Sequence, residues 1–374
     1  MGICESETIK SKEDVPEELY LKKDELKALC FQLKINPNKI YEKNFLYTII
    51  KHSETKEGFI SNEIREILYK YLFNFKIIKK TKKFEYCILS INEKNKLIYT
   101  KNYINWDFSN YETLNSKNLE IINDIETIIK DIPRGIIDIN SIQRNFSYKN
   151  NLEKSTFSKY TFFSSKTFNY NYYQGCLFIY FYFIYLFKDV NYLIGISCLQ
   201  KYFEFFLKDF LLNDSEEKIG NLMLVTMDFI KIINPQIHKI LEENSIFPHR
   251  CIELILTSFI KEDDFENYQE YKFRILDFLI CHKPYFSFLL SAFYIICIIE
   301  NLNCSEIELN SDLILEGLQN YKFNSNDYEN IISKCSNFDE ENFSEIENIL
   351  KKYKDIYKFI FHKDNLGLIS YLIN

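Results

Sequence analysis

Apolar residues recur at three- and four-residue steps over residues 19–75, which is the spacing of helices that bury one face. Helical spacing returns at Asn118 and continues, with breaks, to about Asn303. The polar stretches 149–154, 213–217 and 261–266 are predicted to be turns between helices. Ser61 is predicted to cap a helix whose apolar stripe consists of Ile64, Ile67, Leu68, Tyr71 and Leu72.

Two segments, Cys176 to Phe187 and Tyr285 to Ile299, are apolar almost throughout. Both are shorter than the ~18 to 20 apolar residues that a membrane-spanning helix needs. We therefore predict that both are helices buried in the core of a globular protein.

The polar and apolar pattern divides the chain into three parts. Residues 1–18 are polar and charged, and they are predicted to form a flexible tether. Residues 19–303 are predicted to form one helical domain, although residues 76–117 lack sustained periodicity and are expected to be a long surface connection. Residues 304–374 alternate acidic stretches with short helical patterns, and they are predicted to be a helical carboxy-terminal extension.

Composition supports an all-α globular protein. Of the 374 residues, 47% are hydrophobic and 26% charged, and eight glycines and six prolines are too few for a loop-rich β-sandwich. The net charge of −7 argues against a nucleic-acid surface, because binding phosphates requires clustered Lys and Arg. The ten cysteines are scattered without a Cys-x-x-Cys pair or a histidine cluster, which favours reduced thiols in the cytosol over disulfides or a metal site.

The amino terminus carries a separate signal. Gly2 follows Met1 and Ser6 lies four residues further on, as in N-myristoylated proteins, and Cys4 could carry a second acyl chain. One myristoyl group binds a membrane only marginally, so stable anchoring would need that second chain. An unmodified tail is the alternative interpretation of the same residues.

Four motifs, in order along the chain, resemble those of TBC domains, the modules that activate GTP hydrolysis by Rab proteins. Residues 58–72 begin with a glycine and continue into a helix with arginine at 65 and tyrosine where the family has tryptophan. Residues 138–146 occupy the place of the arginine-finger motif, and the Tyr-x-Gln-Gly glutamine motif is formed by Tyr172, Gln174 and Gly175. The segments 234–238 and 274–284 resemble later TBC helices of the branch that acts on the Rab of endoplasmic-reticulum-to-Golgi traffic.

The resemblance covers residues from about 20 to 300 and implies a fold and a function. The implied fold is an all-α TBC domain with two helical lobes around a groove. The implied partner is a Rab GTPase in its GTP form, which brings its own magnesium ion and nucleotide, so no cofactor is expected on this chain. The implied location is the cytoplasm, with peripheral association with endoplasmic-reticulum and Golgi membranes through a lipidated amino terminus.

The implied chemistry places Gln174 at the nucleotide of the Rab. A planar amide accepts from the attacking water and donates to phosphate at once, so Gln174 can replace the GTPase's own water-positioning residue. An arginine supplied in trans neutralises charge that develops on the γ-phosphate and is worth ~10³ to 10⁵ in rate. A glutamine that only caps the following helix is the structural alternative.

The arginine motif fits in two registers. If Asp138 is the motif aspartate, which would orient the finger arginine, the finger position is Ser141, whose hydroxyl carries no charge. If Ser141 takes the aspartate position, Arg144 is the finger. Ser141 and Arg144 are three positions apart on a predicted helix, so they share a face. The long side chain of Arg144 could therefore replace part of the function that is lost with the finger arginine. The alternative is a surface arginine paired with a nearby acid.

Two further functions remain open from the sequence. Because of Ser141, the domain could be a pseudo-GAP that binds a Rab as an adaptor or scaffold without accelerating hydrolysis. The other possible function is that of a helical scaffold, which is held on membranes through Gly2 and has no GTPase partner. Arg274 and Asp277 are predicted to brace neighbouring helices and not to act in catalysis.

Overall fold

The structure is a computed structural model. It describes residues 17–55, 58–78, 173, 175–187, 192–211, 215–260, 268–303, 310–321 and 325–361. The described residues form 13 α-helices with short 3-10 and π segments and contain no β-strand, so the predicted all-α fold is confirmed. Within the same residues, none of the helices combines the length and the apolar character needed to cross a bilayer.

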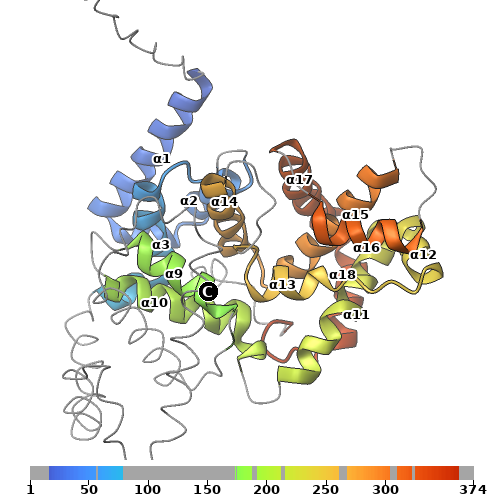
Figure 1. Cartoon of the computed structure of the whole chain (residues 1–374). Helices are drawn as coiled ribbons and strands as arrows, with labels where there is room; N and C mark the ends of the chain where they lie inside the picture. The colour runs from blue at the N-terminus through green and yellow to red at the C-terminus, as the bar shows by residue number, and fades with distance from the viewer. Residues whose placement is uncertain are drawn as a thin grey trace, which may run out of the picture.

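The first group of helices in the chain is α1 (Glu17–Ile35), α2 (Lys43–Ser53) and α3 (Asn62–Ile78), with the short 3-10 helix η1 (Pro37–Tyr41) between α1 and α2. Helices α9 (Cys176–Leu186), α10 (Tyr192–Tyr202) and α14 (Tyr268–Cys281) join this group, since α10 packs against α3 and α9, and α14 packs against α2. Figure 1 shows them together at the left, with α1 leading away from the rest.

The second group is built around α11 (Ser215–Ile233) and α15 (Phe286–Asn303), which form the most extensive helix pair of the described chain. The segments η4 (Phe203–Leu207) and η5 (Lys208–Phe210) lead from α10 into it. It also contains α12 (Pro235–Glu243), α13 (Arg250–Leu256), α16 (Ser311–Asn320), α17 (Ser325–Glu341) and α18 (Phe343–Tyr353), all at the right of Figure 1.

Both segments predicted to be buried core helices are confirmed as such. Helix α9 is apolar on all sides, and each of its described side chains is buried. Helix α15 is buried over most of its length against α11, α13 and α17. One continuous cluster of buried side chains runs through both groups of helices, from Leu26 in α1 to Phe361 beyond α18.

Several helix ends follow from local sequence. Helix α3 begins directly after Ser61, as predicted, and the Ser61 hydroxyl lowers the pKa of Glu63 by a hydrogen bond. Helix α12 begins with Pro235, and the side chain of Asn234 accepts a hydrogen bond from Ile237 N at 3.1 Å. Asparagine as a cap followed by proline in the first turn is a common way to start a helix.

The residues of the predicted carboxy-terminal extension pack into the second group of helices. Helix α17 contacts α15, and α18 contacts α11. Beyond α18, the buried carboxylate of Asp209 accepts hydrogen bonds from Phe359 N at 3.0 Å and Ile360 N at 2.8 Å. The Tyr357 hydroxyl donates to the carbonyl of Lys218 at 2.6 Å, so this turn is tied to two separate elements.

Candidate functional site

Most of the predicted site residues lie outside the described residues, and the structure therefore does not place them. Of the glutamine motif, Gly175 is described, together with Tyr173 on the other side of the glutamine. The predicted residues that lie outside are Gly2, Cys4, Asp138, Ser141, Arg144, Tyr172 and Gln174.

The described neighbours of the glutamine motif pack against the end of α13. The Tyr173 hydroxyl donates a 2.7 Å hydrogen bond to the carbonyl of Leu256, the last residue of α13. Burial and the neighbouring Cys176 hold the pKa of Tyr173 well above its usual value, so this group remains a hydroxyl donor. Cys176 N, in the first turn of α9, donates to the carbonyl of Tyr173 at 3.0 Å.

Gly175 has no room for a side chain. A Cβ atom added there would lie 2.8 Å from Cε2 of Tyr173 and 3.3 Å from the methyl carbon of Thr257. Because the tyrosine is fixed by its hydrogen bond, the ring cannot move away without breaking the contact to α13. The glycine of the motif is therefore required by packing.

The turn against which Gly175 packs has an unusual backbone. Ser258 and Phe259 follow Thr257 with φ angles of +51° and +61°, in the left-handed region that non-glycine residues seldom adopt. Phe259 is fully buried, and its N–H donates to Leu254 O at 2.7 Å. Packing of the phenylalanine in the core thus fixes the shape of this turn.

A second polar centre lies inside the first group of helices, where Asp277 of α14 is fully buried. Arg65 Nε lies 3.1 and 2.9 Å from its two carboxylate oxygens, and the Arg65 side chain is only 3% exposed. The Tyr69 hydroxyl donates to Oδ1 at 2.7 Å, and Phe59 N donates to Oδ2 at 3.0 Å. Residues of the glycine-led segment 58–72 therefore surround the carboxylate of Asp277, which lies 212 positions after Arg65 in the chain.

Gly58 fits this centre for two reasons. Its φ angle is +53°, which favours glycine, and a Cβ atom there would lie 2.8 Å from Oδ2 of Asp277 and 3.2 Å from Cγ of Arg274. The turn before α3 can approach the carboxylate only because this residue has no side chain.

The pKa of the Asp277 carboxyl lies above its usual value, because burial outweighs the effects of the neighbouring groups. Burial raises the pKa of Asp277, and the charge of Arg65 with the hydrogen bonds from Tyr69, Phe59 and Arg65 acts in the opposite direction. Burial and the nearby carboxylate hold the pKa of Tyr69 well above its usual value. Removing one member leaves the others as buried polar groups without compensation, so the centre stabilises the fold as a unit.

Helix α9 contacts the same centre from the side of the glutamine motif. The Tyr182 hydroxyl donates to the Tyr69 hydroxyl at 3.4 Å, and the Tyr182 ring lies 4.6 Å from the ring of Phe273. Through these contacts the helix that begins directly after the glutamine motif is attached to α3 and α14. Helix α9 and the segment 58–72 therefore belong to one packed unit.

The turn between α2 and α3 is fixed to α14 at a second place. His282 Nε2 lies 3.1 Å from a carboxylate oxygen of Glu54, and its Nδ1 lies 2.7 Å from the carbonyl of Phe278. Burial of Glu54 is outweighed by the hydrogen bonds and charges of His282 and Lys51, which hold the pKa of the Glu54 carboxyl below its usual value. Within the described residues no three His, Cys, Asp or Glu side chains lie together as a metal site would require.

Asp277 joins neighbouring helices, as predicted. The sequence indicated only Arg274 as its basic neighbour. The cation at the Asp277 carboxylate is Arg65 of α3, and Arg274 packs its aliphatic carbons beside Gly58. The sequence places Gly58, Arg65 and Tyr69 in one segment, but it carries no signal that connects this segment with Asp277.

No protein-family model matches this chain, and no curated protein matches it in a sequence search.

Proposed function

We propose that this chain is a GTPase-activating protein for a Rab-family small GTPase. The observation that carries the proposal is the order of four TBC-like motifs, with Gln174 in the glutamine motif. The all-α fold is compatible with it, and so is the meeting of the segment 58–72 with Asp277 of the later motif. In this proposal Gln174 orients the water that attacks the γ-phosphate, and the Rab supplies the magnesium ion and the nucleotide.

The packing around Gly175 supports a positioning role for the residues beside Gln174. A hydrogen bond to α13 fixes Tyr173, and the glycine is enclosed by Tyr173 and Thr257. A catalytic side chain acts in trans only if its backbone is held in place, because a small displacement from the productive geometry lowers the rate steeply.

Ser141 favours a second candidate function, a pseudo-GAP that binds the GTP form of a Rab without accelerating hydrolysis. The two functions share the partner and differ in whether Arg144 supplies the charge. A hydroxyl at the finger position would forgo the ~10³ to 10⁵ in rate that a guanidinium contributes. Binding therefore tests what the two have in common, and hydrolysis separates them.

The first experiment measures binding of the full chain to a panel of Rab proteins loaded with GDP or with a non-hydrolysable GTP analogue. Both candidate functions predict that one or more Rabs bind preferentially in the GTP-like form. Equal binding of the two forms, or no binding across the panel, would reject both and leave the membrane scaffold.

The second experiment measures single-turnover GTP hydrolysis by the Rab that binds. A GAP loses acceleration in Arg144→Ala, with Arg250→Ala as the control, because Arg250 pairs with Glu253 of its own helix at 2.9 Å. If Arg144→Ala leaves the acceleration intact, the register with Arg144 as the finger is wrong. If the wild type is inactive and Ser141→Arg alone creates activity, the chain is a pseudo-GAP.

A further inference from the structure

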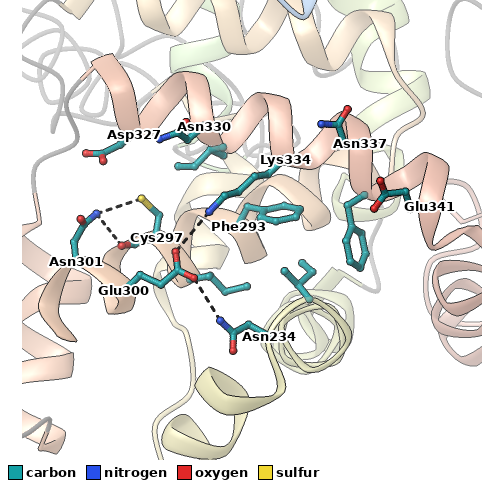
Figure 2. A pocket seen from close by; sticks show the side chains of 14 residues that line it. Asn234, Phe293, Cys297, Glu300, Asn301, Asp327, Asn330, Lys334, Asn337 and Glu341 are labelled. Atoms are coloured by element: carbon teal, nitrogen blue, oxygen red, sulfur yellow. Dashed lines mark hydrogen bonds and ion pairs between the residues drawn. The ribbon is translucent and has the colours of Figure 1, made fainter. Parts of the chain in front are cut away.

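A groove lies between α15 and α17 and is closed on one side by the corner where α11 meets α12 (Figure 2). Its volume is about 610 Å³, within the range of pockets that bind small ligands. It belongs to the second group of helices and shares no residue with the glutamine motif or the Asp277 centre. We refer to it as the α15–α17 groove.

The floor of the α15–α17 groove is apolar and its rim is polar. Phe293 and Ile296 of α15 are 5% and 3% exposed and form the floor, with Ile331 of α17 beside them. Figure 2 shows the polar side chains of α17 along one edge and those of α15 and Asn234 along the other. An apolar floor between two polar edges suits a ligand that has apolar contacts below and hydrogen-bonding groups at its sides.

The charges that line the groove are mainly negative. Glu300, Asp327 and Glu341 contribute three carboxylates against the single ammonium of Lys334. That ammonium lies 3.7 Å from Oε2 of Glu300, so one carboxylate is already paired. Burial raises the pKa of the Cys297 thiol in the same groove to about 12, and Asp327 and Glu300 act in the same direction. A ligand with positive charge is therefore favoured over an anion.

Two asparagines on the α17 edge of the groove are separated by a distance that matches three residues of an extended peptide. Asn330 and Asn337 are both exposed and line the groove, and neither forms a hydrogen bond with another side chain of the described chain. They lie seven residues apart, which is two turns of helix and a rise of ~10.5 Å. Three residues of an extended peptide span about the same length at ~3.3 Å each. Each side-chain amide can donate and accept, as pairing with a peptide backbone requires.

We propose that the α15–α17 groove binds an extended segment of a partner protein that carries lysine or arginine side chains. The amides of Asn330 and Asn337 pair with its backbone, and the apolar floor contacts one side chain. The carboxylate of Glu341 binds one basic group, and a second basic group competes with Lys334 and Asn234 for the carboxylate of Glu300. The proposal does not depend on the action on a Rab, because no residue of that site takes part.

The test uses the full chain and fluorescein-labelled octapeptides with lysine at two positions three residues apart in a serine and leucine background. Matched peptides carry glutamate or glutamine at the same two positions, and binding is measured by fluorescence anisotropy. We expect the lysine peptides to bind best and to lose affinity as salt is added. Glu300→Gln and Glu341→Gln should each weaken binding about two- to fivefold, the range for exposed ion pairs.

Two further variants make the test specific. Asn337→Trp should block the groove and abolish binding, whereas Glu340→Gln, at an exposed acid next to Glu341 that does not line the groove, should leave affinity unchanged. Thermal unfolding of each variant checks that the protein remains folded.

The proposal is overturned if no lysine peptide binds, if the glutamate peptides bind equally well, or if Glu300→Gln and Glu341→Gln have no more effect than Glu340→Gln. It is also overturned if the chain sediments as a dimer that Glu341→Lys dissociates, because a second copy would then be the occupant.

Discussion

Replacing Arg65 by methionine should cost this fold more than any comparable change at an exposed ion pair. The side chain of Arg65 is 3% exposed and that of Asp277 is not exposed at all. Methionine keeps most of the apolar stem but removes the charge and both hydrogen bonds from Nε. The carboxylate would then remain buried with only the hydroxyl of Tyr69 and the amide of Phe59 as donors.

The size of the effect follows from what is left behind. Removing one partner of a buried ion pair typically costs about 3–5 kcal/mol, because the other charge stays buried without compensation. Tyr69→Phe removes one hydrogen bond to a charged group and should cost about 1.5–3 kcal/mol. In the double variant Arg65→Met, Asp277→Leu no charge remains buried, so its cost should be smaller than the sum of the two single variants.

The assay is equilibrium unfolding in urea, followed by the helical circular dichroism signal. The matched control is Arg250→Met, since Arg250 forms a partly exposed pair with Glu253 of the same helix at 2.9 Å. Such a pair contributes about 0–1 kcal/mol. The reasoning is refuted if Arg65→Met is no more destabilising than Arg250→Met, or if the two changes in the double variant are additive.

Four other changes test further residues of the chain. Asp209→Ala should lower the free energy of unfolding by about 2–3 kcal/mol, because it removes the acceptor of two backbone amides. The control Asp228→Ala, at an exposed ion pair, should lower it by less than about 1 kcal/mol. Equal losses of the two variants in urea unfolding would contradict this. Because the pKa of Glu54 is held below its usual value of 4.5, its stabilising effect is present above that pH and is lost as the pH falls through the folded-state pKa. The stability difference between the wild type and Glu54→Gln should therefore shrink on acidification from pH 6, and a constant difference would show that the carboxylate is not responsible. Gly175→Ala should slow the GTP hydrolysis that this chain stimulates on the Rab about 10- to 100-fold with little change in Rab affinity, since the added methyl group displaces Tyr173. An unchanged rate would remove the positioning role. Gly2→Ala should release the chain from membranes in fractionation if Gly2 is myristoylated, and unchanged association would reject lipidation.

Periodicity predicted the fold class well because burial determines it. The apolar stripe from Ile64 to Leu72 and the apolar run from Cys176 are both buried in the core. A helix pairs the backbone N–H and C=O groups of a buried segment within the segment itself. Element boundaries depend on weaker local effects. The polar stretch at 213–217 was predicted to be a turn, yet α11 begins at Ser215, because serine followed by two acidic residues is also a favourable helix start.

The pairing of Arg65 with Asp277 could not be predicted, because sequence spacing gives no information on which buried charges meet across 212 positions. Arg274 was the nearer candidate in the chain, but it lies one helical turn from Asp277 and packs beside Gly58 instead. The α15–α17 groove was equally inaccessible to sequence reasoning, since its two edges come from helices whose polar residues look like ordinary solvated faces. The residues on which the proposed catalysis depends, Gln174 and Arg144, lie outside the described residues, so their roles stay predictions.

The central claim is that the amide of Gln174 acts on the nucleotide of a Rab. The most direct measurement is single-turnover hydrolysis of GTP on the bound Rab, with wild type compared with Gln174→Ala and with Gln236→Ala, an exposed glutamine of α12, as the control. The account predicts that Gln236→Ala accelerates hydrolysis as the wild type does and that Gln174→Ala loses the acceleration while still binding the Rab. Full acceleration by Gln174→Ala would contradict it.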